Sequence, residues 1–468
     1  MKSVVVIYLL GLVVNFVMLN MNKESLKTKT VALKSAAVFM LLFCFSCQNG
    51  NVYNNQQIED VDSSEVKIIS IPSLSGTEVG LFSDVYSSVN YIPLESTPNS
   101  LVGEISRLFI TKSGYFLVYD KNNSSIMVFD SEGKFRNLIG HCGHGPNEYI
   151  FANEVAYNHY NDQVVVYDNA KKTILNYDIN GNFLNKYQLD YHVRTFDVVD
   201  ESHIAVYMDY DADFTNQNVD YNYKIIDNKG IEVKFYDPFN EDMSYFNASC
   251  RGTFHHYSGS LYCQSPYSSF ISEITSDDLV PRYYLSFGKD GIPQDWKKGD
   301  IHEFNDKIKK YSNLTFCENF YESKVYYVMN LVRNKMFCNL LIKKDKNTST
   351  AAFTWINDIN GLVASTDIKS VSNDKIYYSI QNSTFQNVYK SAKDLPCNED
   401  VSERLADNLF KDLSLFSFLV DRGVNEQIKM VKKKYNDVNL TITEKEKECL
   451  KTYASNNNPV IQVCALKN

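Results

Sequence analysis

The sequence predicts an all-β fold, a six-bladed β-propeller with a short helical insertion before a C-terminal closing strand. The first observation is a strand-rich phrase that occurs twice, with Tyr119 and Tyr167, Asp130 and Asp178, and Gly133 and Gly181 each 48 positions apart. A repeat of about 50 residues built from strands is typical of propeller blades. The second observation is a last apolar strand that follows a helical stretch, as expected when the two chain ends close a ring.

The first 46 residues predict a secretory signal region outside the fold. An apolar run, Val31–Phe45, lies behind several lysines and ends at Ser46-Cys47. A basic region, an apolar core and a small residue before the cleavage point are the layout of a signal peptide. The cysteine that follows the small residue resembles a bacterial lipobox, so Cys47 is the expected site of lipid attachment, although Cys44 stands where Leu or Val is usual.

A second apolar run, Val4–Leu19, precedes this signal. It is about 16 residues long, which is short for a membrane span of roughly 20. We therefore favour translation from Met21, whose following residues look like an ordinary signal start, over a first membrane helix.

Residues 47–64 are polar and rich in Asn and Gln, and we interpret them as a flexible tether between the lipid and the domain at 65–468. Residues 1–46 hold five Lys and one Glu, so 42 basic and 55 acidic residues remain after them, a net charge of −13. An acidic body without a basic stripe excludes nucleic acid as the expected partner.

Alternating apolar and polar residues predict strands throughout residues 65–468. A first strand is expected near 66–71, and residues 294–311 are expected to form a partly helical surface insertion. Five blade-like units are expected at about 105–150, 153–192, 193–240, 251–288 and 314–356, and a sixth begins near residue 368.

The sixth unit is interrupted by a helical insertion at about 401–455. Leucines at helical spacing follow residue 402, and Thr443-Glu-Lys-Glu446 is a capping box that predicts the start of a helix. Residues 458–466 then predict the last strand, and we expect it to close the ring with an N-terminal strand.

Four segments carry a resemblance to a known family: Tyr91-Ile-Pro-Leu-Glu95, the strand and turn Val128–Phe135, the loop Gly140–Tyr149, and Asn458-Pro-Val-Ile461. With these segments the sequence resembles the six-bladed β-propeller lipoproteins, NHL-like in fold, of Gram-negative cell envelopes. The loop keeps the whole Gly-x-x-Gly-x-Gly-Pro-x-Glu-Tyr pattern of that family. The resemblance implies the fold and a membrane-anchored envelope location, and it implies no settled activity.

Eight cysteines follow Cys47, at 142, 250, 263, 317, 338, 397, 449 and 464. They form no Cys-x-x-Cys pair and their spacing is irregular, so a zinc site is not expected. An exported protein could pair Cys250 with Cys263 or Cys317 with Cys338, and buried thiols are the alternative.

The loop Gly140–Tyr149 could be interpreted as a phosphate-binding loop, because it has glycines at 140, 143 and 145. Phosphate loops join a strand to a helix, whereas this loop joins two blades, so a glycine-rich crossover is the favoured interpretation. His141 and His144, together with Glu148, are metal-ligand types, but three-residue spacing in a loop does not hold them on one face. We treat His141 and His144 as candidate ligand-binding residues at one mouth of the propeller.

Arg251, His255 and His256 form a second candidate ligand-binding group, at a strand edge that could face the central channel. The sequence contains no Gly-x-Ser-x-Gly motif and no paired-carboxylate signature, so no catalytic residue is assigned. No metal and no cofactor is expected.

The sequence therefore predicts a monomeric envelope lipoprotein, anchored by its N-terminal acyl group and facing the periplasm rather than the cell surface. Its leading function is that of a non-catalytic binding or scaffold propeller for a glycan, a peptide or an envelope protein. The alternative is an enzyme, a lyase or hydrolase with its site in the central channel. An enzyme would need His, Arg and carboxylate groups that converge at one mouth of the channel.

Overall fold

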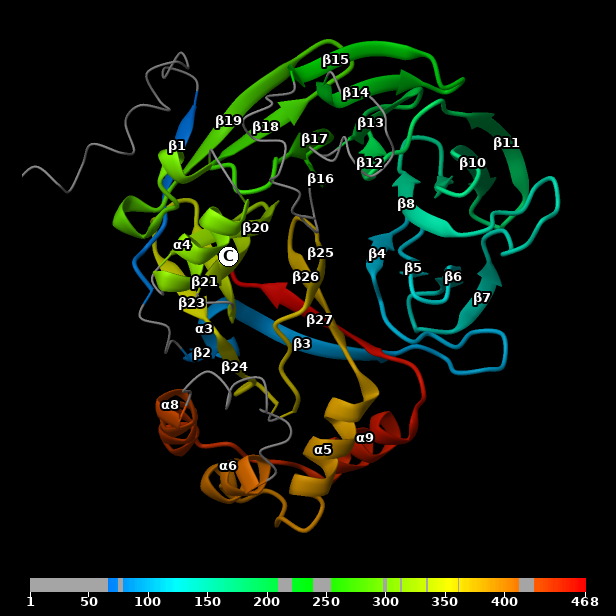
Figure 1. Ribbon diagram of the computed structural model, residues 1–468. Helices are drawn as coiled ribbons and strands as arrows, with labels where there is room; N and C mark the ends of the chain where they lie inside the picture. Colours follow the sequence, from blue (N-terminus) through cyan, green and yellow to red (C-terminus); the bar gives the residue numbers. More distant parts are fainter. Residues whose placement is uncertain are drawn as a thin grey trace, which may run out of the picture. The chain divides into compact units, whose positions relative to one another are not determined.

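Six sheets arranged in a ring make up the fold in the computed structural model (Figure 1). The structure describes residues 66–74, 79–208, 221–238, 254–297, 301–311, 314–333, 336–360, 362–411 and 425–468. All of them belong to one compact unit, Ser64–Asn468. This confirms the predicted six-bladed propeller.

Blades 1 to 3 are four-stranded antiparallel sheets whose strands follow chain order. Blade 1 contains β4 (Arg107–Ile110), β5 (Phe116–Asp120), β6 (Ser125–Phe129) and β7 (Phe135–Leu138). Blade 2 contains β8 (Ala152–Asn158), β9 (Gln163–Asp168), β10 (Thr173–Asp178) and β11 (Phe183–Gln188). Blade 3 contains β12 (Thr195–Val198), β13 (His203–Tyr207), β14 (Tyr221–Asp227) and β15 (Glu232–Pro238).

Blades 4 and 5 follow the same plan, with one addition. Blade 4 contains β16 (Phe254–Tyr257), β17 (Ser260–Cys263), β18 (Phe270–Ile274) and β19 (Leu279–Ser286), and β1 (Lys67–Ser70) pairs in parallel with β19 as a fifth, outer strand. Blade 5 contains β20 (Thr315–Glu322), β21 (Tyr326–Arg333), β22 (Met336–Lys343) and β23 (Ser349–Ala352). Between these blades lie η2 (Gly288–Asp290), η3 (Gln294–Lys297) and α4 (Ile301–Lys310), which agrees with the predicted helical insertion.

Blade 6 closes the ring with strands from both ends of the domain. Its order is β25 (Ile368–Val371), β26 (Lys375–Ile380), β27 (Val460–Leu466) and β3 (Tyr86–Pro93), so the C-terminal strand lies between β26 and β3. A short parallel pair, β2 (Val79–Leu81) with β24 (Thr354–Ile356), and α3 (Phe82–Val85) lead into it. The predicted closure by a C-terminal and an N-terminal strand is confirmed.

Helices near the C-terminus interrupt blade 6 between β26 and β27. They are α5 (Asn382–Ala392), α6 (Ser402–Lys411), α8 (Asn425–Asn436) and α9 (Glu444–Ser455), and they gather beside the closing blade in Figure 1. Thr443 caps α9 in a complete capping box with Glu446, as the sequence predicts. In the described part of the chain, no helix is both long and apolar enough to span a membrane.

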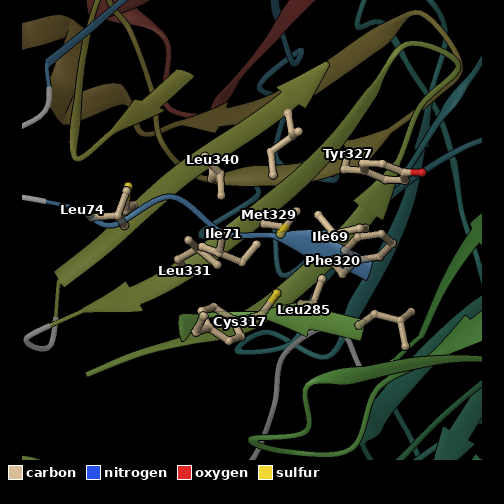
Figure 2. Packing of buried hydrophobic residues seen from close by; sticks show 14 of the residues in the cluster. Ile69, Ile71, Leu74, Leu285, Cys317, Phe320, Tyr327, Met329, Leu331 and Leu340 are labelled. Carbon is tan, nitrogen blue, oxygen red and sulfur yellow. The ribbon is translucent and has the colours of Figure 1, made fainter. Parts of the chain in front are cut away.

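Apolar side chains fill the spaces between neighbouring blades. Figure 2 shows the cluster between blades 4 and 5, where Ile69 and Ile71 from the β1 segment pack with Phe320 and Met329. Cys317 and Cys338 both belong to this cluster, and both are buried thiols. A disulfide between Cys317 and Cys338 is not formed, because Leu331 of the intervening strand β21 pairs with both of them.

One hairpin turn is repeated in blades 1, 2 and 3 and explains the sequence repeat. In each turn an aspartate oxygen accepts N–H groups two and four residues later, and a glycine three residues later has φ between +81° and +88°. The three turns begin at Asp130, Asp178 and Asp227. Aspartate and glycine recur because the turn needs a short side-chain acceptor and a left-handed residue.

Candidate functional site

The first strand of each blade lies nearest the centre of the ring (Figure 1), and two of these strands carry the buried carboxylates Asp197 and Glu322. They are β4, β8, β12, β16, β20 and β25, and neighbouring members contact one another at β8 with β12, β16 with β20, and β25 with β4. The side chains of these strands therefore determine the chemistry near the centre of the ring.

Arg107 on β4 and Glu154 on β8 join the innermost strands of blades 1 and 2. The Arg107 Nε lies 3.3 Å from Glu154 Oε1, and its Nη1 donates to the carbonyl of Val155 at 2.9 Å. Burial lowers the pKa of Arg107, but the carboxylates of Glu154 and Asp197 outweigh that effect and raise it overall. Arg107 is therefore a permanent, half-buried cation with a carboxylate beside it.

Blades 3 and 4 are joined in the same way by Asp197 and His256. His256 Nε2 lies 3.1 Å from Asp197 Oδ1, and the same oxygen accepts the N–H of Val198 at 2.8 Å. Burial raises the pKa of Asp197, but His256, Arg107 and the Val198 N–H together lower it. Asp197 is thus held as a carboxylate although its side chain is only 6% exposed.

His159 lies next to this pair, in the turn between β8 and β9. Its ring centroid is 4.9 Å from that of His256 and 4.0 Å from that of Tyr160. Burial lowers the pKa of His159, and the neighbouring His256 lowers it further. His159 is therefore held neutral beside the Asp197–His256 pair.

His255 points to the other side of β16 and packs as an aromatic residue. Its ring stacks on Tyr262 at 5.0 Å and meets Phe320 edge-on at 5.2 Å. Burial lowers the pKa of His255 to about 3, the nearby His256 lowers it further and Asp197 opposes the change. His255 Nε2 is buried with no hydrogen-bond partner among the described residues, so the ring is neutral and part of the packing.

We expect replacement of His255 by Phe to flatten the pH dependence of stability. The folded pKa of about 3 lies below the unfolded value of 6.5, so the folded state binds fewer protons and stability falls as pH drops through 6.5. The wild type should lose about 2.5 kcal/mol from this group between pH 7 and pH 4.5. His255→Phe should lose none of it, because Phe keeps the stacking on Tyr262.

Urea unfolding at pH 7 and pH 4.5 measures this difference. His144→Gln, at an exposed position, is the control and should keep the wild-type profile. An equally steep profile for His255→Phe would mean that carboxylates, not His255, cause the loss.

The loop Gly140–Tyr149 is the connection between β7 and β8, and its glycine amides are turned towards the protein. The Gly145 N–H donates to Glu148 Oε2 at 2.7 Å, and the Gly143 N–H donates to the Tyr149 carbonyl at 2.8 Å. Lys171 Nζ donates to the Glu148 carbonyl at 2.8 Å. These contacts favour the interpretation as a crossover and leave little of the amide surface that a phosphate would need.

The predicted candidate residues do not form one group. His141 and His144 are exposed in the connection between blades 1 and 2, whereas His255 and His256 lie on the innermost strand of blade 4. Arg251 and Cys47 lie outside the described residues. Among the described residues, no three His, Cys, Asp or Glu side chains are arranged to hold a metal ion.

Sequence reasoning missed the partners of His256, which are Asp197 and His159, and the neighbouring pair of Arg107 and Glu154. A usable signal exists in the repeat. Arg107 pairs with Tyr119 and Glu154 pairs with Tyr167, and these two tyrosines are the repeat landmarks 48 residues apart. Aligning the blades on those tyrosines places Arg107 and Glu154 at the same position of consecutive innermost strands.

Comparisons with known proteins agree on the architecture. The model of a family described as a domain of unknown function (DUF4934) matches residues 68–412. No curated protein matches the chain. Among solved structures, the chain is similar to a Bacteroides fragilis protein that is named as one expected to be exported. The two are 14% identical with a TM-score of 0.60, and the match covers 86% of this chain and 100% of that one.

Two further solved structures are more distant. A member of the DUF4221 family from Bacteroides vulgatus is 14% identical with a TM-score of 0.44, over 63% of this chain and 91% of that one. BamB from Moraxella catarrhalis is 14% identical with a TM-score of 0.33, over 63% of this chain and 86% of that one. At 14% identity, the likeness to the Bacteroides fragilis protein supports the fold alone.

Proposed function

We propose that this chain, which belongs to the DUF4934 family of unknown function, is an exported propeller that binds a ligand without transforming it. In this proposal Cys47 carries a lipid anchor in a Gram-negative envelope, and residues 65–468 face the periplasm as a monomer. The ligand is a glycan, a peptide or an envelope protein. The signal-like segment before Cys47 and the expected export of the Bacteroides fragilis protein with the same fold support the location.

The observation that carries the proposal is the mutual pairing of the polar and charged groups on the innermost strands. Arg107 pairs with Glu154, and Asp197 lies 3.1 Å from His256 Nε2, so each carboxylate already has a partner on the neighbouring blade. The remaining ring nitrogen of His256, Nδ1, is buried and has no partner among the described residues. A general acid or base must reach the substrate, and this nitrogen lies away from solvent. The pairs therefore favour a role in holding the blades together.

The alternative function, a lyase or hydrolase, is favoured by one specific observation. An imidazole oriented by a buried carboxylate, with a second histidine and an arginine nearby, is an arrangement that acid–base catalysis uses. The two functions differ in what happens to the ligand, so a single experiment separates them.

We expect the full-length, detergent-solubilised chain to retain a glycan or peptide ligand and to return it chemically unchanged. The chain is incubated with panels of polysaccharides and envelope peptides, retention is measured, and the recovered ligand is examined by mass spectrometry. Asp197→Asn, which keeps the side-chain shape, should change neither retention nor product. New product termini that disappear in both Asp197→Asn and His256→Gln would instead establish the enzyme.

A further inference from the structure

A polar hollow of about 230 Å³ lies between blades 2 and 3. Blade 2 supplies the end of β8, the turn that follows it, and residues of β9, β10 and β11, and blade 3 supplies the turns after β12 and β14. The hollow is therefore built by two rigid sheets and the turns at their ends, which is a common setting for small-molecule sites. None of the paired residues Arg107, Glu154, Asp197 and His256 lines it.

The chemistry of the lining selects for a neutral, hydroxyl-rich ligand. Six of the lining residues are amides, each able both to donate and to accept hydrogen bonds: Asn158, Asn161, Gln163, Asn176, Asn185 and Asn228. The lining contains no Lys or Arg, and it includes the carboxylates of Glu201 and Asp227, so a phosphate, sulfate or carboxylate ligand would be repelled. Few apolar groups line it, which disfavours a lipid or an apolar side chain.

Several of these polar groups already form hydrogen bonds within the protein, and only the remaining ones are available to a ligand. Asn176 Nδ2 donates to Asn185 Oδ1 at 2.8 Å, and Asp227 Oδ1 accepts the N–H groups of its own turn. By contrast, Asn161 Oδ1 is buried with no partner among the described residues. A buried oxygen without a partner is costly, so a ligand in the hollow would supply the missing donor once the Asn161 side chain turns towards it.

Two more residues add capacity beside Asn161. His203 is held through Nδ1, which lies 2.9 Å from both oxygens of Asp200, so its Nε2 is the ring nitrogen left for another partner. Tyr187, on β11, contributes a half-buried aromatic ring to the same lining. Amides, an imidazole nitrogen and one aromatic ring together match the alternating hydroxyl and apolar faces of a sugar ring.

We propose that this hollow binds one neutral sugar residue of a glycan. The proposal rests on the binding function above and gives that function a ligand class and a site. A hollow smaller than the about 300–1,000 Å³ typical of drug-sized ligands has room for a single ring rather than for an extended chain. The ring hydroxyls donate to Asn161 Oδ1 and exchange hydrogen bonds with Gln163.

Four monosaccharides with the same ring but different charge test the proposal by isothermal titration with the full-length chain in detergent. The set is glucose, N-acetylglucosamine, cationic glucosamine and anionic glucuronate. The neutral sugars should bind and glucuronate should not. Gln163→Leu, which keeps the side-chain volume and removes the amide, should weaken neutral-sugar binding about tenfold. Asn161→Ala should weaken neutral-sugar binding to a similar extent, because it removes one hydrogen-bond acceptor.

Gln188→Leu is the matched control, the same substitution at an exposed residue outside the hollow, and its affinity should stay within about twofold of the wild type. Urea unfolding of each variant separates lost binding from lost folding, and Gln163→Ala is a second variant if Gln163→Leu is unstable.

The other outcomes overturn separate parts of the argument. Neutral sugars that bind equally well to Gln163→Leu, Asn161→Ala and the wild type would remove the hollow as the site and leave the binding function intact. Glucosamine that binds more tightly than N-acetylglucosamine would make Glu201 and Asp227 a cation site and overturn the neutral ligand class. No monosaccharide binding would overturn the sugar site, whereas the binding function fails only if the polysaccharide and peptide panels also yield no ligand.

Discussion

A chain that ends at Asn458 and so lacks β27 is expected to lose cooperative unfolding altogether. β27 is an interior strand of blade 6, paired with β26 over Val460–Ala465 and with β3 over Val460–Leu466. Its side chains from Val460 to Cys464 are all buried. Removing β27 opens the ring and exposes the edges of β26 and β3. Both edges can then pair with strands of other chains, which leads to aggregation.

Deletion of residues 1–78, which removes β1, is the control for the β27 deletion. β1 is also a strand from a chain end, but it covers only the outer edge of blade 4 and leaves four strands in place. Losing the buried Ile69, Ile71 and Leu74 should cost about 5 kcal/mol, yet a single transition should remain. Circular dichroism during urea unfolding, together with dye binding to exposed apolar surface, measures both chains. A sharp transition without β27 would show that the ring does not need closure.

The blades could be predicted from the sequence because their repeated features depend on short-range chemistry. Asp130, Asp178 and Asp227 each bond to backbone groups within four residues, so the same letters recur wherever the same turn forms. The closing strand could also be predicted, since an apolar run after helices has few other places to pair. These features need no knowledge of how the blades face one another.

The pairs between innermost strands could not be predicted in the same way, because each pair joins two different blades. Asp197 and His256 are 59 residues apart, and what brings them together is the order of the innermost strands around the ring. The sequence allowed His255 and His256 to be selected as candidates, but it did not indicate which residues they contact. His255 and His256 are adjacent in sequence and yet differ in environment, because successive residues of a strand point to opposite sides.

Two elements at the edge of the ring were also missed or incompletely predicted. α5 has a first turn of Asn382, Ser383 and Thr384, residues of low helix propensity, so nothing local predicts a helix there. It forms because Phe385 is buried and meets Tyr453 of α9 at 5.2 Å. The strand near residues 66–71 was expected, but its parallel pairing with β19 depends on a contact more than 200 residues away. Tertiary packing determines both.

Gly133→Ala is expected to destabilise the fold by about 4 kcal/mol, although the substitution adds one methyl group. Gly133 has φ +83°, which costs an L-residue about 1–2 kcal/mol. A Cβ there would also lie 2.3 Å from the carbonyl oxygen of Pro93, at the end of β3. The Gly133 carbonyl accepts the Glu95 N–H at 2.8 Å, so the turn cannot move away without breaking that bond. The clash therefore reaches the closing blade.

Gly114→Ala separates backbone strain from the clash. Gly114 has a similar φ of +75°, but a Cβ there would meet no atom within 4 Å. Gly114→Ala should lower the free energy of unfolding by only about 1 kcal/mol, which is the cost of the backbone conformation alone. Urea unfolding of both variants gives the difference, about 3 kcal/mol, which is the contribution of the close approach between the blade 1 turn and β3. Equal losses in the two variants would mean that the turn shifts freely, and that blades 1 and 6 are not locked together at this point.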